Sequence, residues 1–382
     1  MKQARASKPE LPAEFDPDRL QSAVIDFVRF PLIIGVLFVH NYLGYAASLP
    51  VSTICGNFFS QTLGSLTIPA FFFISGFLFF LHTDNFDSGA YRKKLQSRAK
   101  TLLIPYLFWN ILSLTVCSFA HHLPKAVHFF SEPDCNAWTG RYLLQALWAL
   151  PGDGPSVFNY PYAYQFWFIR DLMVMVVLTP IIYFLVKKCR IRIVALLGIL
   201  WFSDWWQRYL PWLAGHGLGI EVLFFFTTGA WFAVNRRNFI EDCGKAAKWA
   251  FVLYPPVAIA DVLTKLPGPG EDPVHLPFLH YSGILLGIVA SFALAAHLLK
   301  TGKARVNTFL ASASFFVFAV HEPLFLTNLR TGIFAVFQPK SDVTLTAVYF
   351  LLVMMVAVAS LGLYWLLRRY LPRFTRIITG GR

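Results

Sequence analysis

The sequence predicts an all-α integral membrane protein, a bundle of about ten transmembrane helices with its N-terminus and C-terminus in the cytoplasm. Three observations support this fold class: the composition, the length of the apolar stretches and the distribution of basic residues. Of the 382 residues, 56% are hydrophobic and 14% are charged, whereas a soluble domain carries about 25% charged residues. This composition excludes a single soluble domain.

Apolar stretches long enough to cross a bilayer recur along the chain. A helix needs about 20 apolar residues to span the hydrocarbon core. The shorter apolar segment 141–150 predicts a helix that lies on the membrane or dips into it. Ten stretches reach the spanning length, at 21–46, 59–82, 99–120, 165–186, 191–210, 217–235, 247–264, 277–299, 308–336 and 343–367.

The basic residues predict the orientation of these helices. With the N-terminus inside, 25 of the 33 Lys and Arg residues lie in cytoplasmic segments and five lie outside. The positive-inside rule predicts this asymmetry and supports an even number of spans. The net charge of +13 therefore needs no nucleic-acid partner, because topology and contact with anionic membrane lipid explain it.

The chain divides into one membrane domain with two short tails. Residues 1–20 form a polar cytoplasmic tail without the pattern of a signal peptide, 21–370 form the transmembrane domain, and 371–382 form the C-terminal tail. The outside loop 121–164 is long enough to cover a site or to bind an acceptor. The cysteines lack metal-binding or redox spacing, so no metal is expected. A disulfide between Cys55 and Cys135, both in outside loops, stays open.

Three charged or titratable residues align in the first predicted span. Asp26 lies three residues before Arg29, a spacing that pairs the two on one helix face. His40 follows Arg29 by eleven residues, which corresponds to about three turns plus 20° and a rise of about 16 Å. Arg29 and His40 therefore point the same way at two depths. Charges are costly inside a membrane, so this column predicts a functional pathway within the bundle.

Two further arginines also lie within predicted spans. Arg170 is adjacent to Asp171 near the outer end of 165–186, and Arg330 lies toward the outer end of 308–336. Either arginine can snorkel or form a structural pair, and this is the favoured interpretation for Arg330.

A second histidine lies inside a late span. His321 is followed by Glu322 and Pro323, and the proline removes a backbone donor and disturbs the helix. A helix break of this kind can line a cavity in a bundle. The alternative, that His321 and Glu322 only hydrogen-bond to neighbouring helices, stays open.

Four stretches together resemble the membrane-bound acyltransferase-3 family. Asp26, Arg29 and His40 match its Arg-x10-His signature, and IPAFFFISGFLFF resembles its second helix. The basic loop YRKKLQSRAKTLLIPYLFW and the late stretch ASFFVFAVHEPLF follow in the family's order, with Phe318 where the family has tyrosine. The stretch FWFIRDL is similar more loosely. The basic loop departs from the family's Arg-x-x-Arg pair, and no hydrolase-like domain is fused to the chain.

The resemblance implies an O-acyltransferase of a bacterial plasma (inner) membrane. Its donor would be cytoplasmic acyl-CoA, with acetyl-CoA as the default, and its acceptor a hydroxyl of an envelope glycan or glycolipid. Without a fused domain, the chain would finish the transfer alone or hand over to an envelope partner protein.

The implied site has His40 as general base, because histidine titrates near neutrality, together with Arg29 and Asp26. Arg170 or His321 would stabilise the oxyanion, with Glu322 in support. Acyl-CoA would be held by Arg29, Lys94, Arg98 and Lys100.

Two other functions compete with this reading. A transporter or flippase would use Asp26, Arg29, His40, Asp204 and Glu322 as a proton or substrate path. Transporters often carry inverted repeats, and no convincing repeat is found in this sequence. The other alternative is a membrane acyltransferase that acts on a lipid or a small metabolite, which differs from the first reading only in its acceptor.

Overall fold

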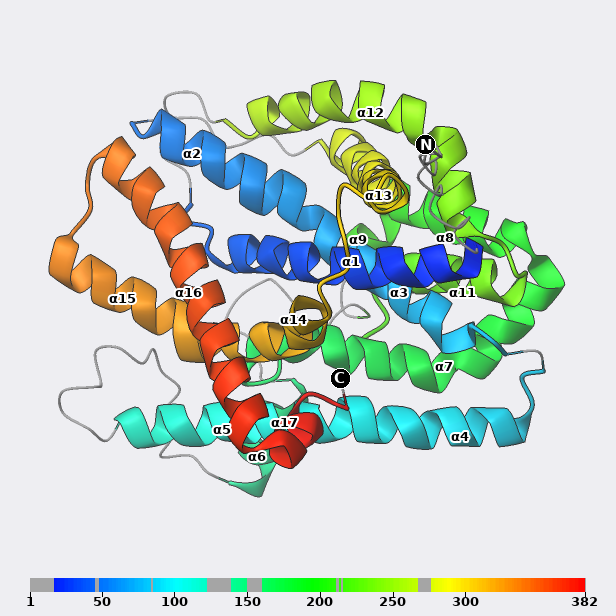
Figure 1. The fold of residues 1–382 in the computed structure, drawn as a ribbon, viewed down its shortest axis with the longest axis horizontal. Coiled ribbons are helices and arrows are strands. Elements are labelled where there is room, and N and C mark those ends of the chain that lie inside the picture. The colour runs from blue at the N-terminus through cyan, green and yellow to red at the C-terminus, as the bar shows by residue number, and fades with distance from the viewer. Residues whose placement is uncertain are drawn as a thin grey trace, which may run out of the picture.

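The computed structural model describes residues 17–44, 48–83, 85–121, 139–149, 160–210, 213, 216–266 and 276–381. Every element in these ranges is helical, as Figure 1 shows, which confirms the predicted all-α class. Eight helical stretches are long and apolar enough to cross a membrane, and two apolar helices are shorter. All ten predicted spans therefore correspond to apolar helices.

The helices follow the predicted stretches closely, and polar residues begin several of them. Asp87, Thr139, Asn238, Asn307 and Ser341 each accept a hydrogen bond from a backbone N–H of the helix that follows, the usual role of these residue types at a helix start. In chain order the α-helices are α1 (Pro17–His40), α2 (Pro50–Gly56), α3 (Thr67–Phe80), α4 (Ser88–Arg98), α5 (Ile104–His121), α6 (Gly140–Trp148), α7 (Trp167–Cys189), α8 (Ile191–Phe202), α9 (Trp205–Tyr209), α11 (Ile220–Val234), α12 (Phe239–Thr264), α13 (Pro277–Lys300), α14 (Thr308–Val320), α15 (Leu326–Phe337), α16 (Asp342–Tyr370) and α17 (Pro372–Ile378).

Wider π-helical turns interrupt three of the long stretches, at Asn57–Leu63, Ala99–Leu103 and His321–Phe325. The last is the sharpest, because Glu322 has extended backbone angles of φ −132° and ψ 150°. The following Pro323 favours this geometry, since a residue before proline avoids the α region. The predicted span 308–336 is thus two helices, α14 and α15, joined by a break.

Close packing around α1 and α3 forms the centre of the bundle. Figure 1 shows α1 crossing the middle of the molecule, and it contacts α13 and α14. Helices α3 and α11 make the most extensive contact, and two glycines let their backbones approach. A Cβ atom on Gly76 would collide with the carbonyl oxygen of Phe226, and one on Gly229 would collide with that of Phe73. Small residues at helix crossings are typical of membrane bundles.

The structure differs from the sequence expectation in the middle of the chain. The predicted span 191–210 ends as a helix at Phe202, and Asp204 then adopts a left-handed conformation with φ 55° before α9 begins. The segment 141–150 contains α6, as predicted, while its placement on a membrane stays a prediction. Cys135 and most of the loop 121–164 lie outside the described residues.

Candidate active site

Four polar side chains converge where α1 ends. His40 is the last residue of α1, and its ring centre lies 5.0 Å from that of His321 and 5.2 Å from that of Tyr164. Tyr164 also interacts electrostatically with Glu322. We refer to His40, Tyr164, His321 and Glu322 as the histidine cluster. Its members come from α1, from the turn before α7 and from the break between α14 and α15.

The break at His321–Phe325 is held in place by side-chain hydrogen bonds. The side chains of His321 and Glu322 are fully buried. Thr327 donates to the Glu322 carboxylate, with oxygen–oxygen distances of 2.8 and 3.0 Å. The amide of Gln165 donates to the carbonyl oxygens of Ala319, at 3.2 Å, and of Glu322. Gln165 therefore satisfies backbone acceptors on both sides of His321, including one that the break exposes.

Arg330 adds a positive charge to the surroundings of the histidine cluster. It lies on α15 and interacts electrostatically with His40, Tyr164 and Glu322. Its side chain is partly buried. The sequence favoured a snorkelling or purely structural role for Arg330. That interpretation does not explain why Arg330 lies close enough to interact with His40, the predicted base.

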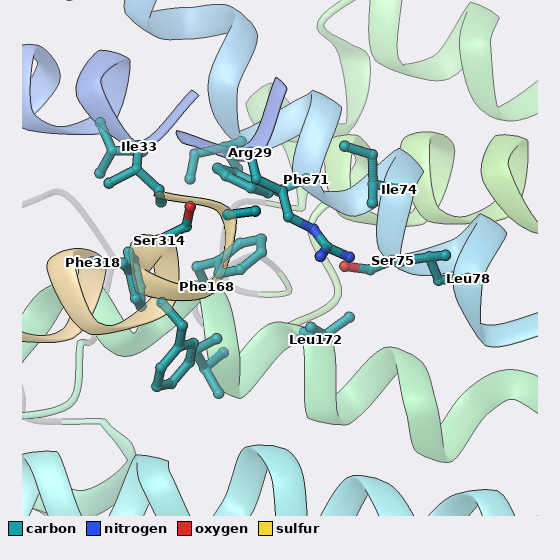
Figure 2. Close-up of a pocket in the computed structure, with 15 residues that line it drawn as sticks. Arg29, Ile33, Phe71, Ile74, Ser75, Leu78, Phe168, Leu172, Ser314 and Phe318 are labelled. Carbon is teal, nitrogen blue, oxygen red and sulfur yellow. The ribbon is translucent and has the colours of Figure 1, made fainter. Parts of the chain in front are cut away.

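Arg29 lines an apolar pocket in the centre of the bundle. Its guanidinium pairs with Asp26 at 2.7 Å, as the spacing of the two residues predicts. The pocket lies between α1, α3, α7 and α14 and has a cavity volume of about 80 Å³. Figure 2 shows the Arg29 side chain reaching into it, with the guanidinium beside Ser75 and with Phe318 at another side of the pocket.

Phe318 joins this pocket to the histidine cluster. Its ring lines the pocket, and the centre of that ring lies 5.9 Å from the centre of the His321 ring. The carbonyl oxygen of Phe318 contacts Nδ1 of His321 at 2.6 Å. The pocket that contains Arg29 thus extends to the residue that holds His321.

Arg98 lines an adjoining pocket, and the other basic-loop residues do not. The Arg98 pocket has a cavity volume of about 40 Å³ and shares Ser75, Leu78 and Leu172 with the Arg29 pocket. Lys94 instead donates to the carbonyl oxygen of Phe79 near the end of α3, at 2.5 Å. Lys100 is exposed. Of the three predicted basic-loop contacts, only Arg98 reaches the connected pockets among the described residues.

Arg170 has a place in the fold away from these pockets. It is 1% exposed and forms an ion pair with Asp171, which is 2% exposed, at 2.9 Å. It also donates to the carbonyl oxygen of Trp148, the last residue of α6, at 3.1 Å. Arg170 lines neither described pocket, so its observed contacts anchor α6 to α7.

The fold does not bring all five residues of the predicted transport path to one place. Asp204 accepts a hydrogen bond from Tyr281 of α13 at 3.0 Å and lines neither the Arg29 pocket nor the Arg98 pocket. Within the described ranges, no group of three or more His, Cys, Asp or Glu side chains is arranged to hold a metal ion.

Sequence reasoning missed Tyr164, Gln165 and Thr327. Tyr164 and Gln165 open the stretch YQFWFIRDL, in which attention fell on the arginine and the aspartate. The partners of Gln165 are more than 150 residues away in the chain, and Tyr164 meets His40 of α1, so no local pattern could reveal either residue. Thr327 lies five residues after Glu322, and this separation brings the two together only because the helix is broken between them.

Comparison with known proteins gives a consistent result over nearly the whole chain. A family model described as an acyltransferase domain, that of the acyltransferase-3 family, matches residues 23–369. The chain is also 26% identical over 372 residues to the succinoglycan biosynthesis protein ExoH of Rhizobium meliloti (strain 1021), covering 94% of this chain and 92% of that protein. No solved structure matches the chain.

Proposed function

Because this chain belongs to the acyltransferase-3 family, we propose that it is a membrane O-acyltransferase that transfers an acyl group from acyl-CoA to a hydroxyl of an envelope glycan. The donor is acetyl-CoA, the membrane is a bacterial inner membrane, and the base is His40. The similarity to a protein named for succinoglycan biosynthesis supports a glycan as the acceptor.

The observation that carries this proposal is the connection between the pockets and the histidine cluster. Arg98 and Arg29 line two adjoining pockets, and Phe318 lies between the Arg29 pocket and His321. A donor that enters past Arg98 would place its phosphates near guanidinium groups, which bind phosphate well. Its chain and thioester would follow the apolar walls toward His40.

The chemistry that we propose needs one base and one leaving group. A ring nitrogen of His40 takes the proton as the acceptor hydroxyl oxygen attacks the thioester carbonyl carbon. The new carbon–oxygen bond forms, the carbon–sulfur bond breaks, and the CoA thiolate leaves and is protonated by the imidazolium of His40. The positive charge of Arg330 lies close enough to interact with His40, so it favours negative charge that develops on the carbonyl oxygen.

The test is CoA release from acetyl-CoA by the purified protein, with and without an envelope glycan extract. We expect release that the glycan stimulates, and we expect His40→Ala to lower it by about 100-fold to 10,000-fold, the usual contribution of a general base. His297→Ala is the matched control, since His297 is an exposed histidine in the last turn of α13. Absence of acyl-CoA binding and turnover by folded protein would refute the proposal and favour transport.

A further inference from the structure

His321 has one ring nitrogen engaged and the other buried without a partner. Nδ1 lies 2.6 Å from the carbonyl oxygen of Phe318. A carbonyl oxygen only accepts hydrogen bonds, so Nδ1 must carry the hydrogen. In the neutral ring Nε2 is then a bare acceptor, and it has no hydrogen-bond partner in the described part of the chain. The ring itself is 0% exposed.

Nε2 of His321 is one of several buried polar side-chain atoms for which no partner is found among the described residues, and its ring lies beside that of His40. Most buried polar atoms in proteins are hydrogen-bonded, because a buried group without a partner loses its hydrogen bonds to water and gains none in exchange. The backbone that carries the His321 ring is also held in place, since Gln165 donates hydrogen bonds to the backbone on both sides of it. The site therefore presents a fixed lone pair at Nε2 of His321.

His40 is the group best placed to use that lone pair. Its ring centre is 5.0 Å from that of His321, a separation at which a nitrogen of each ring can approach to about 3 Å. No hydrogen bond involving the His40 ring is found among the described residues, so none of these residues already fixes its tautomer. His40 is also the last residue of α1.

We infer that His321 is the positioning residue for His40. Nε2 of His321 accepts a hydrogen bond from one ring N–H of His40, directly or through one water molecule. This bond fixes the tautomer of His40, so that its other nitrogen carries the lone pair that takes the proton of the acceptor hydroxyl. The same contact stabilises the imidazolium of His40 after it has taken the proton. A chain of hydrogen bonds then runs from the acceptor through His40 and His321 to the carbonyl of Phe318.

This inference rests on the proposed role of His40 as base, and it assigns the two histidines different tasks. His40 touches the reacting hydroxyl, whereas His321 acts through His40. A neutral histidine has two tautomers, and only one of them presents a lone pair in a given direction. A hydrogen bond from a neighbouring group commonly selects the tautomer that catalysis needs, and loss of that orienting group lowers kcat strongly.

The kinetic test uses two substitutions at one position. In His321→Phe the acceptor atom is lost, and we expect kcat to fall about 100-fold while KM for acetyl-CoA changes less than about twofold. In His321→Gln the amide oxygen lies near the place of Nε2 and can accept the same bond, so we expect kcat within about tenfold of wild type. Unchanged kcat in His321→Phe, or an equal loss in both folded variants, would overturn the inference.

A second measurement separates this inference from the proposed function. With ¹⁵N-labelled histidine in lipid bilayers, nitrogen chemical shifts distinguish protonated from bare ring nitrogens without any turnover. We expect a single His40 tautomer in the wild-type protein and a mixture in His321→Phe. A His40 spectrum unaffected by that substitution would overturn the inference even if His40→Ala abolishes activity. A shift to a mixture in a protein without acyl-CoA turnover would refute only the proposed function.

Discussion

Residues of the same type have different tasks in this bundle, and their partners reveal which. The guanidinium of Arg170 is buried against Asp171 and the end of α6, so its charge is neutralised by a partner within the fold. Arg29 pairs with Asp26 at the edge of a pocket. Arg98 lies over the ring of Phe79 at 5.9 Å and has no carboxylate partner among the described residues. Arg98 is therefore the guanidinium best prepared to receive an anionic ligand.

At the residue scale, we expect Arg98→Gln to raise KM for acyl-CoA about tenfold and to leave kcat nearly unchanged. The reason is that a phosphate contact made equally in the ground state and the transition state contributes to binding alone. Initial rates over a range of acetyl-CoA concentrations measure both constants. Arg92→Gln on the exposed face of the same helix α4 is the control. The same rise in that control would mean that general positive charge, and not the pocket, attracts the donor.

At the scale of elements, the helices were predictable and their interruptions were not. The length of each apolar run determines where a span lies, so α13 and α16 match the predicted ranges within a few residues. The break between α14 and α15 was signalled locally by Pro323. Pro105 lies just after the wide turn at Ala99–Leu103, whereas the wide turn at Asn57–Leu63 contains no proline, so its winding depends on packing between helices.

The packing of helices against one another also depends on residues that no sequence pattern identifies as contacts. Gly76 and Gly229 read as ordinary glycines in apolar runs, yet each touches a backbone carbonyl of the opposite helix. The ion pair of Arg29 with Asp26 was predictable, because a spacing of three residues places both side chains on one helix face. The contacts of Gln165 and Tyr164 were not predictable, because these contacts depend on which helix lies opposite. Only the folded structure determines that.

Gly229→Val should destabilise the protein by about 3 kcal/mol, the upper end of the usual cost of overpacking, because a side chain there would force α3 and α11 apart. The thermal unfolding midpoint of purified protein in detergent measures the effect. Gly362→Val is the matched control, since nothing lies within 4 Å of a Cβ atom at Gly362. Equal midpoints for the two variants would show that the close crossing of α3 and α11 does not limit stability.

At the scale of the whole molecule, the proposed reaction requires a definite orientation. Arg98 and Arg29 line adjoining pockets, and His40 lies about three turns of α1 beyond Arg29. Donor from the cytoplasm and acceptor from outside can meet at the histidine cluster only if the end of the molecule near Arg98 faces inward. The distribution of Lys and Arg predicts this orientation, and the fold itself is compatible with either one.

Labelling of single cysteines decides between the two orientations. We expect Cys135, in a chain whose other cysteines are replaced by alanine, to react with a membrane-impermeant maleimide in intact cells, because it falls in the predicted outside loop 121–164. Lys303→Cys, in a chain without other cysteines, should react only after permeabilisation, since Lys303 is exposed in the predicted cytoplasmic turn between α13 and α14. The reverse pattern would place the histidine cluster on the cytoplasmic side. An acyl-CoA donor would then have no bundle to cross, and the pocket between Arg98 and Phe318 would need a different occupant.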